Sequence, residues 1–151
     1  MDGGDLSTYK LAIAEKKKES FPESKAKKFN IYHGAAEDSK IESNSQDLAC
    51  LCLVAHESPK WVSKSIFDEA FRILKPGGSF TMLDLDKNNL ENLLANPFVA
   101  AIYKQTEPYM AEFLALSPKE DLEESGFEVT SIGKASRSHT VYVARKPLTA
   151  A

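Results

Sequence analysis

The clearest pattern of apolar and polar positions lies between residues 66 and 84. Five apolar residues there recur at the spacing of one helix face: Ile66, Phe67, Ala70, Phe71 and Leu74. This spacing predicts an amphipathic helix with one buried side. Pro76 cannot continue the helix, and the two glycines after it adopt positive φ at little cost, so a tight reversal is expected. Residues 79–84 then predict a short apolar strand that ends in Asp84, which completes half of a parallel α/β layer.

A second apolar run covers residues 48–55 and has no polar interruption. Such a run predicts a strand buried on both faces, as is typical of a central strand in a parallel sheet. Cys50 and Cys52 lie two apart in this run, a spacing that suits neither an ordinary disulfide nor a closed metal site. We therefore expect them to be small buried hydrophobic residues in a reducing compartment. His56 and Glu57 follow directly, where the ligand crevice of an open α/β sheet lies.

The rest of the pattern predicts further elements on both sides of this core. Helical segments are expected over residues 8–19, 90–116 and 118–125, and strands over residues 29–33, 128–132 and 140–144. Ser7 and Ser117 are favourable N-caps, and Gly126 ends the last helix. The last two strands are short and rich in β-branched residues, so they predict a terminal hairpin.

Composition and charge exclude several classes of function but do not identify one. A chain of 151 residues is long enough for one domain with a core. The formal net charge of −3 argues against a nucleic-acid or anionic-membrane binder. No apolar run has the length of a membrane span, and no secretory signal opens the chain, so a cytoplasmic location is expected, or a plastid if a longer precursor exists. We find no zinc spacing, phosphate loop or Ser/His/Asp motif.

Residues 69–78, Glu-Ala-Phe-Arg-Ile-Leu-Lys-Pro-Gly-Gly, resemble the EAxRxLKPGG segment before the fifth strand of class I S-adenosylmethionine (SAM)-dependent methyltransferases. They most resemble the small-molecule branch related to quinone and sterol methyltransferases, and residues 56–59 and 106–109 resemble its plant-type members. The resemblance begins at the family's second strand, without the first strand and its DxGxGxG loop. It implies an α/β fold: a Rossmann-like sheet lacking the first strand, with a C-terminal antiparallel hairpin. Residues 1–151 would then be a partial methyltransferase domain, its C-terminal two-thirds.

The resemblance also assigns cofactor-binding residues. Gly-Asp-Leu-Ser at residues 4–7 is similar to the family's xDLS segment, so Asp5 would accept hydrogen bonds from the ribose hydroxyls, with Leu6 beside it. The loop after residue 33 resembles the family's GDAED loop, which holds adenine. Ala35 occupies the place of its first acidic residue, so one contact to the adenine amino group has no side chain. The adenine contacts implied here come from the following residues: Ala36, through its backbone, and Glu37 or Asp38.

His56 matches a histidine that the family places near the transferred methyl group, so it would accept a proton from the substrate. The alternative is a histidine that satisfies loop carbonyls. The function implied is SAM-dependent methyl transfer to a small-molecule acceptor, although without the glycine-rich loop we expect the isolated chain to be inactive. The alternative is a non-catalytic module that binds a protein partner, or a second copy, through the edge of the strand over residues 48–55. That edge would stay open unless residues 29–33 pair with it. A nicotinamide-binding domain is disfavoured because the sequence contains no GxGxxG.

Overall fold

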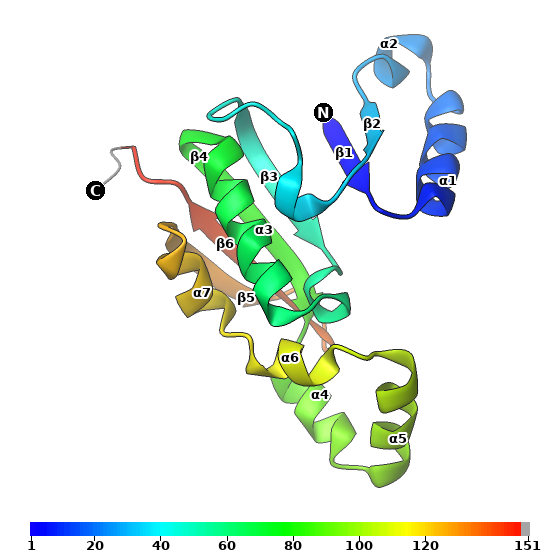
Figure 1. The fold of residues 1–151 in the computed structure, drawn as a ribbon, viewed down its shortest axis with the longest axis vertical. Helices are drawn as coiled ribbons and strands as arrows, with labels where there is room; N and C mark the ends of the chain where they lie inside the picture. Colours follow the sequence, from blue (N-terminus) through cyan, green and yellow to red (C-terminus); the bar gives the residue numbers. More distant parts are fainter. Residues whose placement is uncertain (149–151) are drawn as a thin grey trace. The chain divides into compact units, whose positions relative to one another are not determined.

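The computed structural model describes residues 1–148, which divide into an N-terminal unit, residues 1–40, and a C-terminal unit from residue 41 onward. Each unit has a sheet of its own, and Figure 1 shows the elements of both. No helix among the described residues is long and apolar enough to cross a membrane.

The N-terminal unit is built on a two-stranded parallel sheet. Strand β1 (Asp2–Asp5) pairs with β2 (Asn30–His33), and between them lie α1 (Thr8–Glu19) and α2 (Glu23–Ala26). The Ser7 hydroxyl accepts a hydrogen bond from the Lys10 N–H, which confirms the predicted cap of α1. A 3₁₀ turn, η1 (Ala36–Asp38), follows β2. Because the strands are parallel, the segments that follow them emerge at the same edge of the sheet.

The C-terminal unit is built on a four-stranded sheet in the order β3–β4–β6–β5. Its strands are β3 (Gln46–Cys52), β4 (Leu74–Leu85), β5 (Glu128–Lys134) and β6 (His139–Arg145). Its helices are α3 (Lys60–Ile73), α4 (Lys87–Leu94), α5 (Pro97–Thr106), α6 (Met110–Ala115) and α7 (Pro118–Glu124), with a 3₁₀ turn, η2 (Ala55–Glu57), after β3. The pair β3–β4 is parallel and the pairs β4–β6 and β5–β6 are antiparallel, so both the parallel layer and the terminal hairpin are confirmed.

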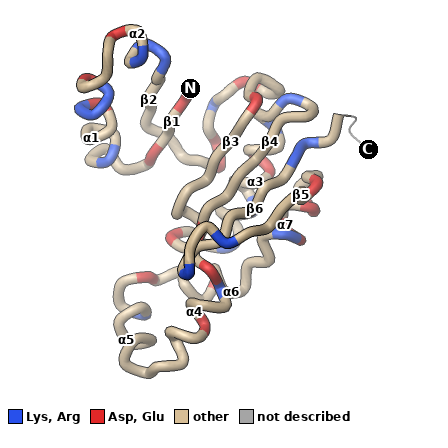
Figure 2. The backbone as a smooth tube through the Cα atoms, turned by 180° about the vertical axis from the view of Figure 1, so that it is seen from behind, with Lys and Arg blue, Asp and Glu red and all other residues tan. Residues whose placement is uncertain are grey.

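Helix α3 covers this sheet with the face that its periodicity predicts. Ile66, Phe67 and Ala70 are buried in the core with Phe80 and Met82 of β4, and Phe71 packs against them. The Phe67 and Phe80 rings meet edge to face, with centroids 5.9 Å apart. Figure 1 shows α3 and α7 on one face of the sheet, and Figure 2 shows the strands from the other side, where no helix of this unit lies over them.

The prediction that the apolar run over residues 48–55 is buried on both faces is wrong. Strand β3 lies at the edge of the sheet, and its side chains alternate between the helix-covered face and the bare face. Leu51 is 7% exposed, whereas Leu48 is 56% exposed, and Cys50 and Cys52 are exposed with it. Of the two alternatives for the edge of this strand, pairing with residues 29–33 does not occur, since β2 pairs with β1 in a separate sheet. Apolar character alone does not decide which faces of a strand are covered.

The Pro-Gly-Gly segment forms a bulge rather than a turn between helix and strand. Leu74 already has extended backbone at the end of α3, and it pairs with Gln46, whereas the next pair joins Leu48 to Ser79. Residues 75–78 therefore loop out of the ladder, and Gly77 adopts the expected positive φ of 81°.

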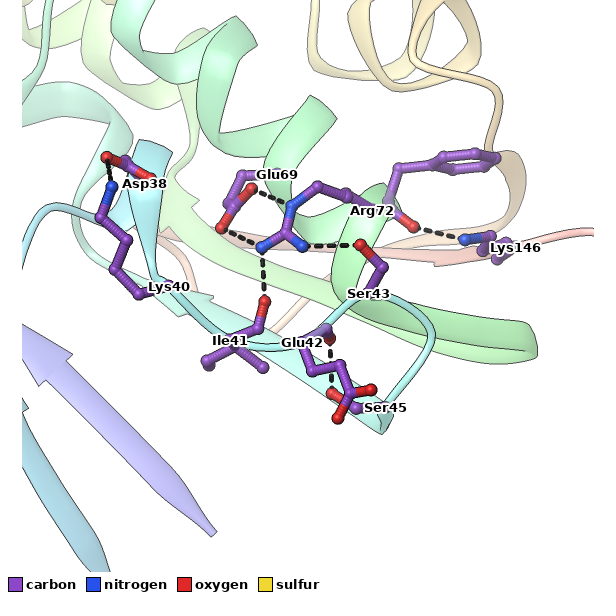
Figure 3. Close-up of polar contacts among 10 residues, drawn as sticks. Asp38, Lys40, Ile41, Glu42, Ser43, Ser45, Glu69, Arg72 and Lys146 are labelled. Atoms are coloured by element: carbon purple, nitrogen blue, oxygen red, sulfur yellow. Dashed lines mark hydrogen bonds and ion pairs between the residues drawn. The ribbon is translucent and has the colours of Figure 1, made fainter.

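Two cationic side chains, Arg72 and Lys146, form hydrogen bonds with the segment before β3 and with the end of α3 (Figure 3). The Arg72 guanidinium donates to both Glu69 oxygens, at 2.7 and 2.8 Å, and to the Ile41 carbonyl and the Ser43 hydroxyl in the segment before β3. The buried Lys146 ammonium donates to the Phe71 and Leu74 carbonyls, which lie at the helix C-terminus. Burial lowers the pKa of Lys146.

Candidate functional site

A histidine and a buried carboxylate meet at the carboxyl ends of two parallel strands. His56 lies in η2, directly after β3, and Asp84 lies near the end of β4. The His56 Nδ1 atom is 2.6 Å from Asp84 Oδ1. Asp84 is fully buried, and it also accepts hydrogen bonds from the Ala55 and Leu85 backbone N–H groups, at 2.9 and 2.8 Å. The backbone thus holds the carboxylate in place, and the carboxylate orients the imidazole.

This environment strengthens His56 as a base. Its hydrogen bond with Asp84 raises the pKa of His56 above 6.5, against the opposing effect of burial, and the negative charges of Asp84, Glu57 and Glu107 act in the same direction. Because a carboxylate only accepts hydrogen bonds, Nδ1–H donates to Asp84, and Nε2 is the nitrogen that can accept a proton. The Phe113 ring packs edge-on to the imidazole, with centroids 6.2 Å apart, and the His56 side chain is 11% exposed.

An imidazole with one nitrogen fixed on a carboxylate and the other available is suited to removing a proton from a bound molecule. The sequence indicated His56 but not its partner as a site residue. The signal for Asp84 was present, since a strand ending in a carboxylate lies beside a strand followed by histidine. Parallel pairing brings those two ends together.

In the N-terminal unit, the segments after β1 and β2 are joined by hydrogen bonds. The Gly34 N–H donates to the Asp5 carbonyl at 3.3 Å, and His33 Nε2 lies 3.0 Å from the Leu6 carbonyl. The half-buried Asp5 carboxylate accepts from the Ser7 N–H through Oδ1, at 2.7 Å. Its other oxygen has no hydrogen bond among residues 1–148, so it can receive a ligand hydroxyl.

The three residues implied for adenine form η1. Ala36 is exposed, Glu37 is half-buried, and the Asp38 carboxylate is paired with Lys40. The structure therefore brings Asp5, Leu6 and η1 to one edge of the two-stranded sheet, with Glu37 as the carboxylate of η1 that forms no ion pair among the described residues.

A pocket of about 580 Å³ lies at the end of β4, between the first residues of α4 and α7 and the β5–β6 hairpin. Asp86, Lys87, Lys134 and Tyr142 line it, whereas His56 and Asp84 do not. Burial and the nearby Asp86 charge raise the pKa of Tyr142. The aromatic residues of the segment over residues 90–116 do not line this pocket: Phe113 is buried in the core and Phe98 is 74% exposed. Within residues 1–148 no group of three or more His, Cys, Asp or Glu side chains could hold a metal ion.

Comparison with known proteins gives one family match. The family described as "Methyltransferase domain" matches residues 2–82 of the chain, which include Asp5, η1 and His56. No curated protein matches the sequence.

Solved structures resemble the chain along almost its whole length. One is a SAM-dependent methyltransferase from Methanosarcina mazei, with a TM-score of 0.71 and 20% identity. The match spans 98% of this chain and 82% of the methyltransferase chain. A candidate methyltransferase from Bacillus halodurans covers 97% and is covered to 82%, with a TM-score of 0.69 and 17% identity. A geranyl diphosphate methyltransferase in complex with SAM covers 96% and is covered to 68%, with a TM-score of 0.71 and 9% identity. At these identities the likeness shows the fold, a Rossmann-like α/β fold with a mixed sheet.

Proposed function

This chain belongs to the family of class I methyltransferase domains, and from this we propose that it serves SAM-dependent methyl transfer to a small-molecule acceptor, with His56 as the proton acceptor. The observation that carries the proposal is the His56–Asp84 pair at the carboxyl ends of β3 and β4. Bound SAM would supply the methyl group on a sulfonium. An acceptor hydroxyl or amine must lose its proton as it is methylated, and His56 Nε2 is the atom that takes it.

Asp84 is the positioning residue in this proposal. It keeps Nδ1 protonated and the ring fixed, so that Nε2 presents its lone pair. Methyl transfer is an in-line displacement, so positioning carries most of the catalysis and one well-placed base is sufficient.

The N-terminal unit offers groups that fit the nucleoside part of SAM. The Asp5 carboxylate retains one oxygen for the ribose hydroxyls, with Leu6 next to it. Adenine would lie against Ala36, Glu37 and Asp38, where the Ala36 backbone and the Glu37 carboxylate are the groups to contact it. The similarity of residues 69–78 to the small-molecule branch supports a small acceptor.

The test is methyl transfer at millimolar SAM to a panel of phenols, carboxylic acids and amines, followed through S-adenosylhomocysteine formation. Replacement of a general base lowers the rate by about 10²–10⁴-fold, so we expect a loss of that size in His56→Gln. His139→Gln is the matched control, because His139 lies in β6 and the hydrogen-bond partner of its ring among the described residues is the Ser136 hydroxyl. Turnover that is equal in the two variants would refute the role of His56.

The second candidate is a non-catalytic module that binds a protein partner or a second copy. One observation favours it: β3 is an edge strand of its sheet with a 56% exposed Leu48, and its one charged residue, Asp47, lies near its start. Charged edges resist pairing, and uncharged ones invite it. Light scattering would then show a dimer that Leu48→Lys dissociates and Ile132→Lys on β5 does not.

A further inference from the structure

The two cysteines of the chain lie together on a surface that the proposed methyl transfer does not use. Cys50 and Cys52 are both free and both exposed. They are separated by one residue of β3, so their side chains project from the same face of the strand. This is the bare face of the sheet, which no helix of the C-terminal unit covers (Figure 2).

The spacing of the two thiols excludes a direct bond between them but leaves room for a bridging atom. Residues i and i+2 of a strand are about 6.6 Å apart, and their Cβ atoms project side by side at a similar distance. A disulfide needs Cβ atoms only about 3.8 Å apart, so this pair stays as two thiols. With metal–sulfur bonds of about 2.3 Å, a linear sulfur–metal–sulfur unit spans about 4.6 Å, which both side chains reach by leaning toward each other.

The neighbouring strand orients one thiol and provides apolar surroundings for the other. Cys50 is in register with Thr81 of β4, whose hydroxyl donates to the Cys50 sulfur at 3.1 Å. Cys52 is in register with Leu83, and Leu48 lies on the other side of Cys50 along the same face. The Cys50 sulfur is therefore oriented by the Thr81 hydroxyl, and Leu48 and Leu83 are the apolar neighbours of the two cysteines on this face.

The number of ligands decides which ion such a pair suits. No third His, Cys, Asp or Glu joins them into a larger group within the described part of the chain. Zinc requires four ligands, and calcium and magnesium require oxygen ligands. Soft thiolates select monovalent copper, whose d¹⁰ configuration accepts two ligands in a line. We propose that Cys50 and Cys52 form a two-coordinate site for Cu(I) on the bare face of the sheet.

The proposal is tested on the full chain, reduced and kept anaerobic, by titration with Cu(I) against a chromogenic Cu(I) chelator. We expect one copper per chain, with a thiolate-to-copper absorption band in the ultraviolet. Changes to supporting residues already cost about 10–100-fold in metal affinity, so the loss of one of two ligands, in Cys50→Ser or Cys52→Ser, is expected to cost more than about 100-fold. Thr81→Val is the matched control, since it removes the support of Cys50 but keeps both sulfurs and should keep one copper per chain.

Three results would overturn the site: no retention of copper against the chelator, equal retention by a single-serine variant, or one copper shared by two chains. Circular dichroism of the serine variants shows that a lost site is not a lost fold. The readout involves neither SAM nor an acceptor, so its outcome is independent of the outcome for the proposed function.

Discussion

Asp84 shows how a single buried carboxylate can organise a site. Burial of a charge is costly unless the charge is hydrogen-bonded, and here three donors satisfy it: the backbone N–H groups of Ala55 and Leu85 and the imidazole of His56. Two of the donors belong to the chain just after β3, so the carboxylate also fastens η2 to the end of β4. His56 is therefore held in place by one of the three hydrogen bonds that stabilise the buried Asp84 carboxylate.

A first prediction concerns the pKa of His56. By NMR, the wild-type His56 ring should titrate above pH 6.5, and Asp84→Asn should lower its pKa, because the hydrogen bond and charge that raise it are removed. The chain has three histidines, and His33→Gln and His139→Gln assign the other two signals. An unchanged His56 pKa in Asp84→Asn would contradict the pairing.

The sign of the effect on stability follows from the same shift. A histidine whose pKa is higher in the folded state stabilises fully below its unfolded pKa, and the contribution is lost as pH rises through the folded pKa. The loss of unfolding free energy in His56→Gln should thus be larger at about pH 5.5, on the order of 1.5–3 kcal/mol for a charge-assisted hydrogen bond, than at about pH 9. Urea denaturation at the two pH values measures it.

At the scale of elements, the bulge at the start of β4 joins α3 to the sheet. The chain leaves α3 at Leu74, loops out, and re-enters the ladder at Ser79. Two backbone hydrogen bonds to Lys146, just after β6, stabilise the bulge. The Gly77 N–H donates to the Lys146 carbonyl at 2.8 Å, and the Lys146 N–H donates to the Gly78 carbonyl at 2.9 Å. Glycine is required where the chain packs against itself, since a Cβ on Gly78 would lie 2.9 Å from the Lys75 carbonyl oxygen.

A second prediction tests this close approach. Gly78→Ala should lower the free energy of unfolding by about 1–3 kcal/mol, because the methyl group meets a backbone oxygen that cannot move aside cheaply. Gly133→Ala in β5 is the matched control: nothing lies within 4 Å of its added Cβ, so a change within about 0.5 kcal/mol is expected. Urea denaturation of both variants measures the difference, and equal effects would show that the bulge is not sterically constrained.

At the scale of the whole molecule, the groups proposed for methyl transfer are divided between the two units. The N-terminal unit carries Asp5, Leu6 and η1 for the nucleoside, and the C-terminal unit carries His56 and Asp84 for the proton. The printed sequence contains no DxGxGxG motif, the pattern that the resemblance associates with the methionine part of SAM.

A third prediction follows for this chain by itself. Calorimetry with micromolar SAM should show no saturable binding. No residue of this chain is assigned to bind the carboxylate and amino group of the methionine part of SAM, and each missing charge-assisted hydrogen bond is worth about 1.5–3 kcal/mol. Asp5→Ala is the control. Micromolar binding that this substitution abolishes would contradict the prediction and show that other residues hold the methionine part.

Features that depend on local spacing could be predicted from the order of the amino acids. The bounds of α1 and its Ser7 cap, the buried face of α3, the parallel pair β3–β4 and the terminal hairpin were all predicted, because helical periodicity, capping and β-branched runs act over a few neighbouring residues. His56 could also be predicted as a candidate site residue, because open parallel sheets bind ligands at the carboxyl ends of their strands.

The surroundings of these elements could not be predicted in this way, because they depend on contacts between distant parts of the chain. An uninterrupted apolar run describes the side chains of β3, but the burial of each face depends on which helices and strands cover it. Within the described part of the C-terminal unit, no helix covers one face of this sheet and β3 pairs with a strand on one side only. The exposure of Cys50 and Cys52 follows from that. The hydrogen bond from His56 to Asp84 likewise joins residues 28 positions apart, and it exists because two parallel strands end side by side.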